Sequence, residues 1–151
     1  MMDRDQTNAM TPTTPLADGE TVQHSFRPDR ATYWRDHAWM AAGAMALGMA
    51  ILWAIGNPHV WTGAVGGLAA IAVRAAYVAS DELAARWDLT DRRLLGPGGR
   101  AVTLARIKAV NRLGSAVQIV TDAGDKHLIK YQPDSADTRA RLQRAMAGGA
   151  G

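Results

Sequence analysis

The 151-residue chain carries a formal net charge of +3 at pH 7 and contains no cysteine. This length fits one ordinary domain, or a small domain with an added segment, and the absence of cysteine excludes disulfides, thiolate nucleophiles and cysteine-based metal sites. Hydrophobic residues make up 48% and charged residues 21%, a balance that excludes a wholly disordered charged chain.

The first segment, residues 1–36, is polar and repeatedly interrupted by residues that break helices and strands. Pro12, Pro15, Gly19 and Pro28 divide it into short pieces, and neither helical nor strand periodicity runs through it. The segment is therefore predicted to be a flexible N-terminal tail.

Two apolar segments follow, and together they predict a two-helix transmembrane hairpin over residues 37–81. The stretch from Ala38 to Gly56 contains no charged residue, and as a helix it would span about 28 Å, close to the hydrocarbon thickness of a bilayer. A second apolar stretch, from Val60 to Ser80, is interrupted only by Arg74. The alternative is a pair of buried helices in a soluble bundle. The remaining C-terminal residues are too few to surround both helices unless an oligomer does so.

Aromatic and basic residues flank these apolar segments. Aromatic side chains collect at membrane interfaces, and all five tryptophans are expected there: Trp34, Trp39, Trp53, Trp61 and Trp87. The turn between the segments lacks Lys and Arg, whereas arginines precede the first segment and follow the second. By the positive-inside rule we expect both termini in the cytoplasm.

One charge lies inside the second apolar segment. Arg74 is within about two helical turns of the predicted cytoplasmic end, so its long side chain is expected to reach the headgroups without a protein partner. The alternative interpretation is a functional charge within the membrane.

Small residues recur at four-residue spacing in both segments. They are Ala42, Ala46, Ala50 and Ala54 in the first, and Gly63, Gly67, Ala75 and Ala79 in the second. Small residues let helix backbones approach closely in a membrane. Because alanine is abundant here, only Gly63 and Gly67 are predicted to pack within the hairpin, with contact to a partner subunit as the alternative.

Beyond Leu83 the pattern changes to short segments separated by turn residues, which predicts a small β domain over residues 82–147. We expect strands at residues 86–89, 93–95, 100–104, 108–113, 116–121 and 126–131. The separators are rich in glycine and aspartate, which favour tight turns. Residues 103–113 also suit a short helix, because Leu104, Ile107 and Val110 recur at three-residue spacing.

A final helix is predicted after Pro133. Asp134 or Ser135 can cap its start, and Asp137 suits the positive end of the helix dipole. An apolar stripe should pack this helix against the β layer, and it consists of Thr138, Leu142, Ala145 and Met146. The glycine-rich residues 148–151 are expected to fray.

The β domain opens with a motif placed directly after the predicted hairpin. The motif is Trp87-Asp88-Leu89-Thr90-Asp91-Arg92-Arg93-Leu94-Leu95, followed by Val102, Leu104, Ile107 and Val110 and then by Gln118-Ile119-Val120-Thr121 before Gly124. This order resembles the bacterial PH-like domain family of membrane-flanked proteins, in which an aromatic-x-Leu-Thr-Asp/Asn-x-Arg motif follows two transmembrane helices. The resemblance covers about residues 37–147. It implies a membrane α-hairpin plus a small PH-like β domain, a bent antiparallel sheet or partial barrel capped by a C-terminal helix.

Few residues point to catalysis or to ligand chemistry. The segment from Gly96 to Ala101 fits a loose G-x-G-x-x-A dinucleotide fingerprint, but no βαβ unit follows, so a hairpin turn is the better interpretation. The four histidines lack ligand spacing: His24, His37, His59 and His127. We therefore expect no enzymatic activity, no catalytic residue, no cofactor and no metal site.

Basic residues of the β domain form the remaining candidate surface. Candidate contacts to lipid or to a partner are Arg92, Arg93, Lys126 and Lys130, because each cation near an anionic leaflet gains about 1 kcal/mol. Both arginines also fit as solvated turn residues, or as ion-pair partners of Asp88 or Asp91. Nucleic acid is not an expected partner, because the basic residues lack interleaved aromatic side chains.

These observations predict a non-enzymatic inner-membrane protein whose cytoplasmic PH-like domain is a protein-docking surface. The resemblance is compatible with an accessory or assembly subunit of a membrane complex, with membrane lipid and a membrane protein as partners. A sheet edge, or the groove beside the terminal helix, is the expected docking place. The alternative function is a module that binds anionic lipid headgroups.

Overall fold

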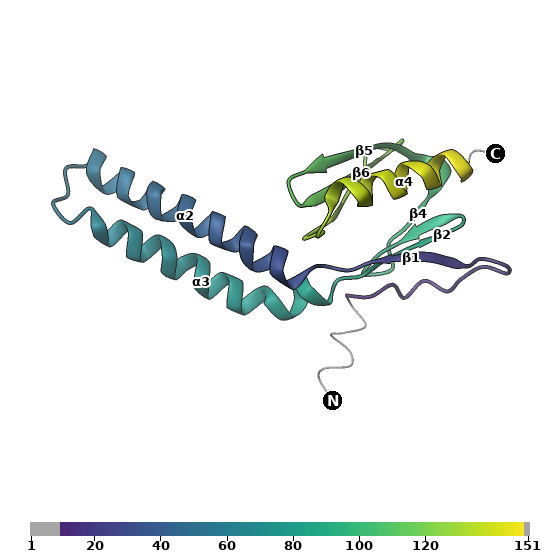
Figure 1. Ribbon diagram of the computed structural model, residues 1–151, viewed down its shortest axis with the longest axis horizontal. Helices are drawn as coiled ribbons and strands as arrows, with labels where there is room; N and C mark the ends of the chain where they lie inside the picture. Colours follow the sequence, from purple (N-terminus) through teal and green to yellow (C-terminus); the bar gives the residue numbers. More distant parts are fainter. Residues whose placement is uncertain (1–9, 150–151) are drawn as a thin grey trace, which may run out of the picture. The chain divides into compact units, whose positions relative to one another are not determined.

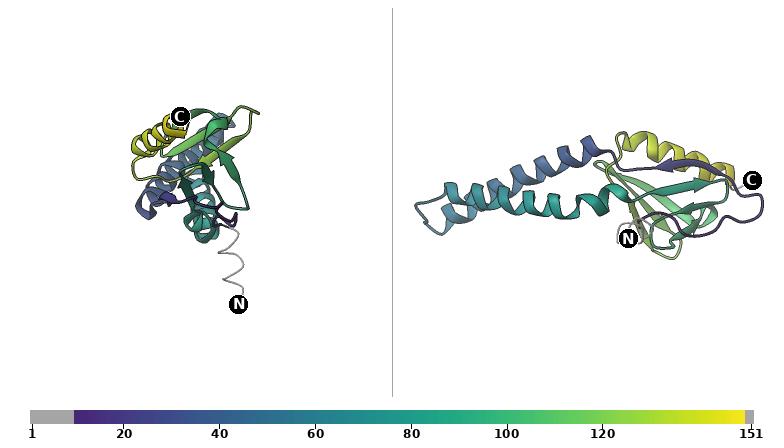
Figure 2. Two further views of the ribbon diagram at one scale, coloured as in Figure 1. Left: turned by 90° about the vertical axis from the view of Figure 1, so that its right-hand side faces the viewer. Right: turned by 90° about the horizontal axis from the view of Figure 1, so that it is seen from below.

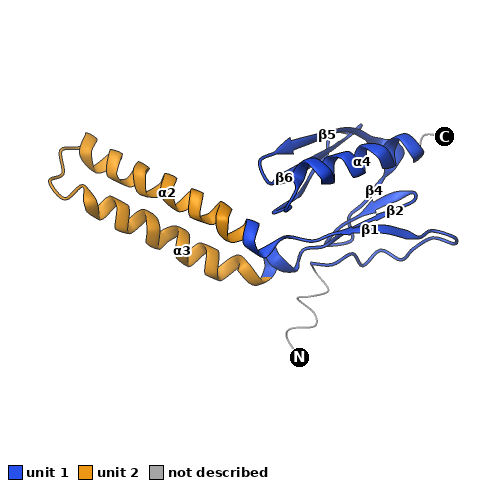
Figure 3. Ribbon diagram, in the orientation of Figure 1, with its two compact units in different colours: residues 1–32, 81–151 blue, residues 33–80 orange. Residues whose placement is uncertain are grey.

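The computed structural model describes residues 10–149, and the chain divides into two compact units. The helical unit comprises residues 33–80, and the β unit combines the segments before and after it (Figure 3). The predicted flexibility of residues 1–9 and the fraying of residues 150 and 151 lie outside the described residues.

Two antiparallel helices account for the helical unit: α2 (Arg30–Ala54) and α3 (Trp61–Ala84). They run side by side in every view (Figures 1 and 2). Both are long and apolar enough to cross a membrane. Helix α2 begins earlier than predicted, because the Asp29 carboxylate accepts a hydrogen bond from the Thr32 amide at 2.9 Å and so caps the first turn.

Glycines allow the close approach of the two helices. A Cβ atom on Gly63 would lie 2.3 Å from the carbonyl carbon of Gly48, and one on Gly67 would lie 2.5 Å from the carbonyl oxygen of Ala44. Such distances exclude any side chain, so Gly63 and Gly67 lie where α3 meets α2.

The alanine repeat of the first helix, which was not predicted to pack, lies outside the packing face of α2. Ala42, Ala46, Ala50 and Ala54 are all exposed, whereas Tyr33, His37 and Ala41 are buried. The packing face of α2 is therefore the one that carries Tyr33, His37, Ala41 and Gly48, not the one that carries the alanine repeat.

The β unit contains two antiparallel sheets. The first has the order β1-β2-β3-β4, with β1 (Val22–Phe26), β2 (Trp87–Thr90), β3 (Arg93–Leu95) and β4 (Ala101–Thr103). The second has the order β5-β6-β7, with β5 (Ile107–Leu113), β6 (Ala116–Thr121) and β7 (Lys126–Ile129). A short 3-10 helix, η1 (Leu104–Arg106), separates them. The hydrogen bonds thus form two sheets where one bent sheet or a partial barrel was predicted, and the helical alternative for residues 103–113 is realised only in η1.

Strand β1 corrects the prediction of a flexible tail over residues 1–36. It pairs with β2 through Ser25 opposite Asp88 and Phe26 opposite Trp87. The Phe26 side chain is 2% exposed and belongs to the core. The N-terminal segment is therefore part of the β domain, because a long-range pairing supplies the partner that local periodicity did not reveal.

The core of the β unit is one cluster of apolar side chains from both sheets and the terminal helix. Among its members are Trp87, Leu94, Val117, Ile119, Ile129 and Leu142. The prediction that Trp87 lies at a membrane interface is wrong, because its side chain is 4% exposed within this cluster. Its ring also requires a glycine at position 96, where a Cβ atom would lie 2.4 Å from the indole.

Helix α4 (Ser135–Gly149) packs on this core. Asp134 caps it by accepting a hydrogen bond from the Asp137 amide at 3.0 Å, whereas Ser135 donates to the carbonyl of Gly114 at 2.8 Å. Leu142 is fully buried, and Ala145 and Met146 pack beside it. Residues 148 and 149 are helical rather than frayed. The molecule thus has two long apolar helices, two antiparallel sheets and a C-terminal helix.

Candidate functional site

A groove of about 560 Å³ lies in the β unit between β1 and α4. Gln23 and His24 of β1 form one wall, and Arg141, Arg144 and Ala145 of α4 form the other. In the right-hand view of Figure 2, β1 and the yellow helix α4 are adjacent in projection, and residues of both line the groove. Because β1 is the first strand of its sheet, its outer edge has no strand partner among the described residues.

The lining of the groove combines buried residues with charged ones. Leu89 and Leu104 line it and are 4% and 3% exposed. The ionisable residues of the lining are His24, Asp91, Arg141 and Arg144. The single carboxylate among them is already engaged, since Asp91 accepts a hydrogen bond from the Thr21 amide at 3.1 Å. The lining is therefore net basic.

Ion pairing along α4 orients one of these arginines. The Asp137 carboxylate accepts a hydrogen bond from Arg141 Nε at 2.8 Å, one helical turn away. This bond lowers the pKa of Asp137, and the positive charge of Arg144 acts in the same direction. Arg144 donates through Nε to the carbonyl of Ala140 at 3.3 Å, which leaves the outer nitrogens of its guanidinium available to a ligand.

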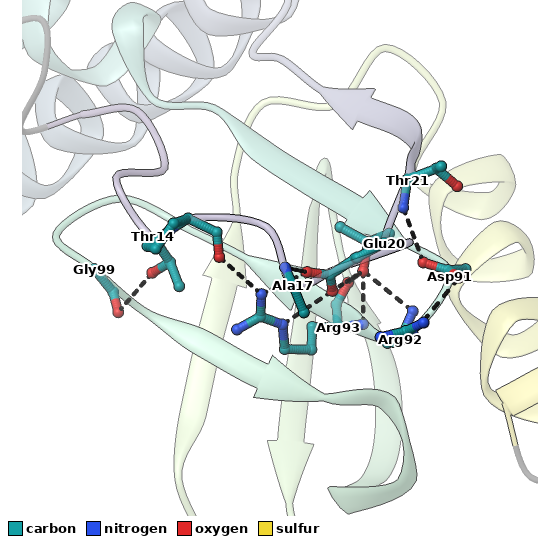
Figure 4. A network of polar contacts seen from close by, with 10 residues as sticks. Thr14, Ala17, Glu20, Thr21, Asp91, Arg92, Arg93 and Gly99 are labelled. Carbon is teal, nitrogen blue, oxygen red and sulfur yellow. Dashed lines mark hydrogen bonds and ion pairs between the residues drawn. The ribbon is translucent and has the colours of Figure 1, made fainter.

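A buried ion pair holds in place the segment that leads into β1, which forms one wall of the groove (Figure 4). Glu20, just before β1, has a side chain that is fully buried and binds the guanidinium of Arg93 on β3 through both carboxylate oxygens. The Glu20 carboxylate also accepts hydrogen bonds from Thr90 Oγ1 at 2.8 Å and from the Ala17 amide at 2.9 Å. These contacts hold the segment that enters β1 against the β2–β3 hairpin.

The same contacts determine the charge state of Glu20. The hydrogen bond from Arg93 lowers the pKa of Glu20 from 4.5 to about 2, although burial opposes the shift. The carboxylate is therefore ionised at neutral pH, and a buried carboxylate of this kind is stable only while its partners are in place.

The four predicted contact residues have different surroundings. Arg93 is bound to Glu20, and Lys130 lies 3.3 Å from Glu82. Arg92 is exposed and lies 3.8 Å from Asp91, as one interpretation of the sequence anticipated. Lys126 is exposed and has no ion pair among the described residues. The arginines lie at the β2–β3 hairpin and the lysines at or next to β7. Three of the four cations therefore pair with three different carboxylates, those of Asp91, Glu20 and Glu82.

The glycine-rich segment and the histidines have local roles. Gly96 donates its amide hydrogen to the carbonyl of Arg100 at 2.8 Å, so residues 96–100 close the hairpin between β3 and β4. The ring of His127 packs on Trp87, with ring centroids 5.9 Å apart. Among residues 10–149, no group of three or more His, Cys, Asp or Glu side chains is placed to hold a metal ion.

Sequence reasoning missed Glu20, the β1 wall of the groove with His24, and the lining arginines Arg141 and Arg144. The alternation of Val22, His24 and Phe26 is the strand signal within this segment, but flanking prolines and polar residues mask it. Comparison with known proteins adds no assignment, since no family model, curated protein or solved structure matches this chain.

Proposed function

We propose that this protein is a membrane-anchored, non-enzymatic docking protein. The α2–α3 hairpin anchors it in the bacterial inner membrane with both termini in the cytoplasm. Its β unit is a PH-like domain that binds an extended acidic segment of a membrane-protein partner. The observation that carries the docking role is the basic groove between β1, an edge strand of its sheet, and α4.

Exposure of the apolar helices supports the anchor. A helix in the core of a soluble protein is mostly buried, but only 11% of the apolar window of α2 and 6% of that of α3 are buried. Apolar side chains exposed along both helices include Leu47, Ile51, Val65 and Val73. Exposing them to water is unfavourable, whereas lipid solvates them and the helices satisfy their own backbone groups.

The position of arginines supports the orientation. The turn between α2 and α3 carries no Lys or Arg, and Arg30 and Arg86 lie at the other ends of the helices. The positive-inside rule then places both termini, and with them the β unit, on the cytoplasmic side.

The edge of β1 supports recognition of an extended segment. An unpaired strand edge offers main-chain hydrogen bonds to an added strand, and pockets beside it select the side chains. Arg141 and Arg144 line the same groove as Gln23 and His24 of β1, so carboxylates on the added segment would be favoured.

The alternative function, binding of anionic lipid headgroups by the basic residues of the β2–β3 hairpin and β7, receives less support. Arg93 and Lys130 already pair with carboxylates, and Arg92 lies within reach of Asp91. A headgroup would have to compete with these partners, whereas within residues 10–149 the groove arginine Arg144 hydrogen-bonds only to a backbone carbonyl.

Site-specific photo-crosslinking in membranes tests the docking proposal. A photoreactive residue is placed at Gln23, on the β1 wall of the groove, or at the exposed Asn111 of β5 as a position outside it. We expect a discrete protein adduct from position 23 that maps to an acidic segment of the partner, and none from position 111.

Charge reversal on α4 supplies the matched control. R144E should abolish the adduct from position 23, while R139E, an exposed arginine that does not line the groove, should leave it intact. An adduct that survives R144E, an adduct to lipid alone, or equal adducts from both positions would contradict docking at this groove.

A further inference from the structure

Arg74 is the only Lys, Arg, Asp or Glu between Asp36 and Asp81 in the sequence. It lies on α3, is exposed, and has a partner on α2: its Nη1 atom is 3.3 Å from Nε2 of His37. The expectation that Arg74 has no protein partner is therefore wrong. An arginine in an apolar helix is costly unless its guanidinium is paired or reaches the headgroups.

The hydrogen bonds of His37 define the direction of this contact. Its Nδ1 atom lies 2.8 Å from the carbonyl oxygen of Tyr33, and a carbonyl can only accept, so Nδ1 carries the hydrogen. The Nε2 atom of the neutral ring is then an acceptor, and it receives a hydrogen bond from Arg74. His37 is 3% exposed, so this acceptor is held inside the hairpin.

Tyr33 holds the pair in place. Its ring packs on that of His37 with centroids 4.1 Å apart, and its hydroxyl donates to the carbonyl of Ala75 at 2.7 Å. Because Ala75 directly follows Arg74, the same tyrosine fixes the imidazole and the backbone beside the arginine. The guanidinium is thus oriented before any ligand binds.

The depth of the guanidinium follows from its partner. His37 immediately precedes the uncharged stretch that begins at Ala38, so Arg74 reaches the boundary of the apolar region. Its only hydrogen bond among the described residues uses one of the five guanidinium hydrogens. Two parallel N–H groups suit the oxygens of a phosphate.

We propose that the Arg74 guanidinium, positioned by His37, binds the phosphate of an anionic phospholipid of the cytoplasmic leaflet. This inference rests on the anchoring half of the proposed function and is independent of docking at the groove. A carboxylate on a neighbouring membrane protein is the competing partner, and the position at the headgroup boundary favours lipid.

Native mass spectrometry of the full chain in detergent micelles tests the lipid site. The probes are phosphatidylglycerol and phosphatidylcholine, added separately to wild type, R74Q, R74K and R35Q. We expect R74Q to retain about fivefold less phosphatidylglycerol than wild type, and R74K to be intermediate because ammonium cannot form the bidentate contact. R35Q removes an exposed arginine of α2 that pairs with Asp36, and it should retain phosphatidylglycerol like wild type.

A second pair of variants tests positioning by His37. H37Q keeps a hydrogen-bond acceptor and should bind phosphatidylglycerol nearly as wild type does. H37L removes the acceptor and should retain little more phosphatidylglycerol than R74Q does. Circular dichroism of each variant verifies that the helices remain folded. Equal losses in H37Q and H37L would overturn the positioning role.

Three outcomes would overturn the lipid site itself. They are equal retention of phosphatidylglycerol by wild type and R74Q, equal losses in R74Q and R35Q, and displacement of the lipid by millimolar inorganic phosphate, which would assign the site to a soluble phosphate. A different result would show that the α2–α3 hairpin is not a membrane anchor. The chain would then stay dispersed without detergent in wild type and in every variant at position 74.

Discussion

At the residue scale, the β unit depends on one buried carboxylate. Glu20 is 6% exposed, and its oxygens accept hydrogen bonds from Arg93, Thr90 and the amide of Ala17. Sequence gave no indication of this contact, because Glu20 and Arg93 are far apart in the chain and no motif relates them. Arg93 itself stood out in the sequence, but as a candidate ligand contact rather than as half of an internal ion pair.

Replacement of Glu20 by glutamine tests the contribution of this carboxylate. E20Q retains the shape but loses the charge, so hydrogen bonds to a charged group become neutral ones, and we expect a loss of about 2 kcal/mol in local stability. Hydrogen exchange of the Arg93 amide, which donates to Thr90 Oγ1 at 2.8 Å, measures this loss. E82Q is the control: its pair with the exposed Lys130 should contribute less than about 1 kcal/mol.

The same residue predicts how stability depends on pH. The pKa of Glu20 is about 2 in the folded protein against an ordinary value of 4.5, so the unfolded chain binds the proton more tightly. The stabilisation should be fully present above pH 4.5 and should be lost as the pH falls from there toward 2. Hydrogen exchange at a series of pH values should show this dependence in wild type and a flatter one in E20Q. Equal slopes in the two proteins would refute the assignment.

At the element scale, local patterns predicted the strands well where turn residues separate them. Strand β6 has the predicted bounds, and β7 begins at the predicted residue, because Asp122 to Asp125 mark the turn between them. Strand β1 was missed, because its partner β2 follows helix α3 and is therefore separated from β1 by the whole helical hairpin. The face of α2 was also missed, because alanine repeats say nothing about which side meets a neighbour.

Helix contact in the hairpin makes a sharp prediction for two glycines of α3. In G63A the added Cβ would lie within 2.4 Å of the Gly48 backbone, so the helices must separate, at a cost of about 1–3 kcal/mol. G66A is the matched control, because nothing lies within 4 Å of its Cβ and alanine favours the helix by up to about 1 kcal/mol. Thermal loss of helical circular dichroism in detergent should therefore occur earlier in G63A and no earlier in G66A. Equal midpoints for the two variants would argue against close packing at Gly63.

At the scale of the whole molecule, the sequence predicted the division into apolar helices and a small β domain, with a groove beside the terminal helix as a docking place, but not the strand β1 that forms the other wall of the candidate groove. The groove needs β1, β2, η1 and α4 together, and Gln23 and Arg144 lie at opposite ends of the chain. Their proximity follows from β1 joining the first sheet. The predicted basic residues were selected by sequence proximity instead, which is why they are distributed over β3, β7 and the adjoining turns.

Fractionation of cells that produce the full chain tests whether lipid surrounds α2 and α3. Membranes are collected by ultracentrifugation, washed with alkaline carbonate and then extracted with mild detergent. The chain should stay in the washed membrane pellet and enter solution only with detergent, because the exposed apolar side chains of both helices need a non-aqueous environment. A chain recovered in the carbonate supernatant, and monodisperse in plain buffer, would contradict this prediction.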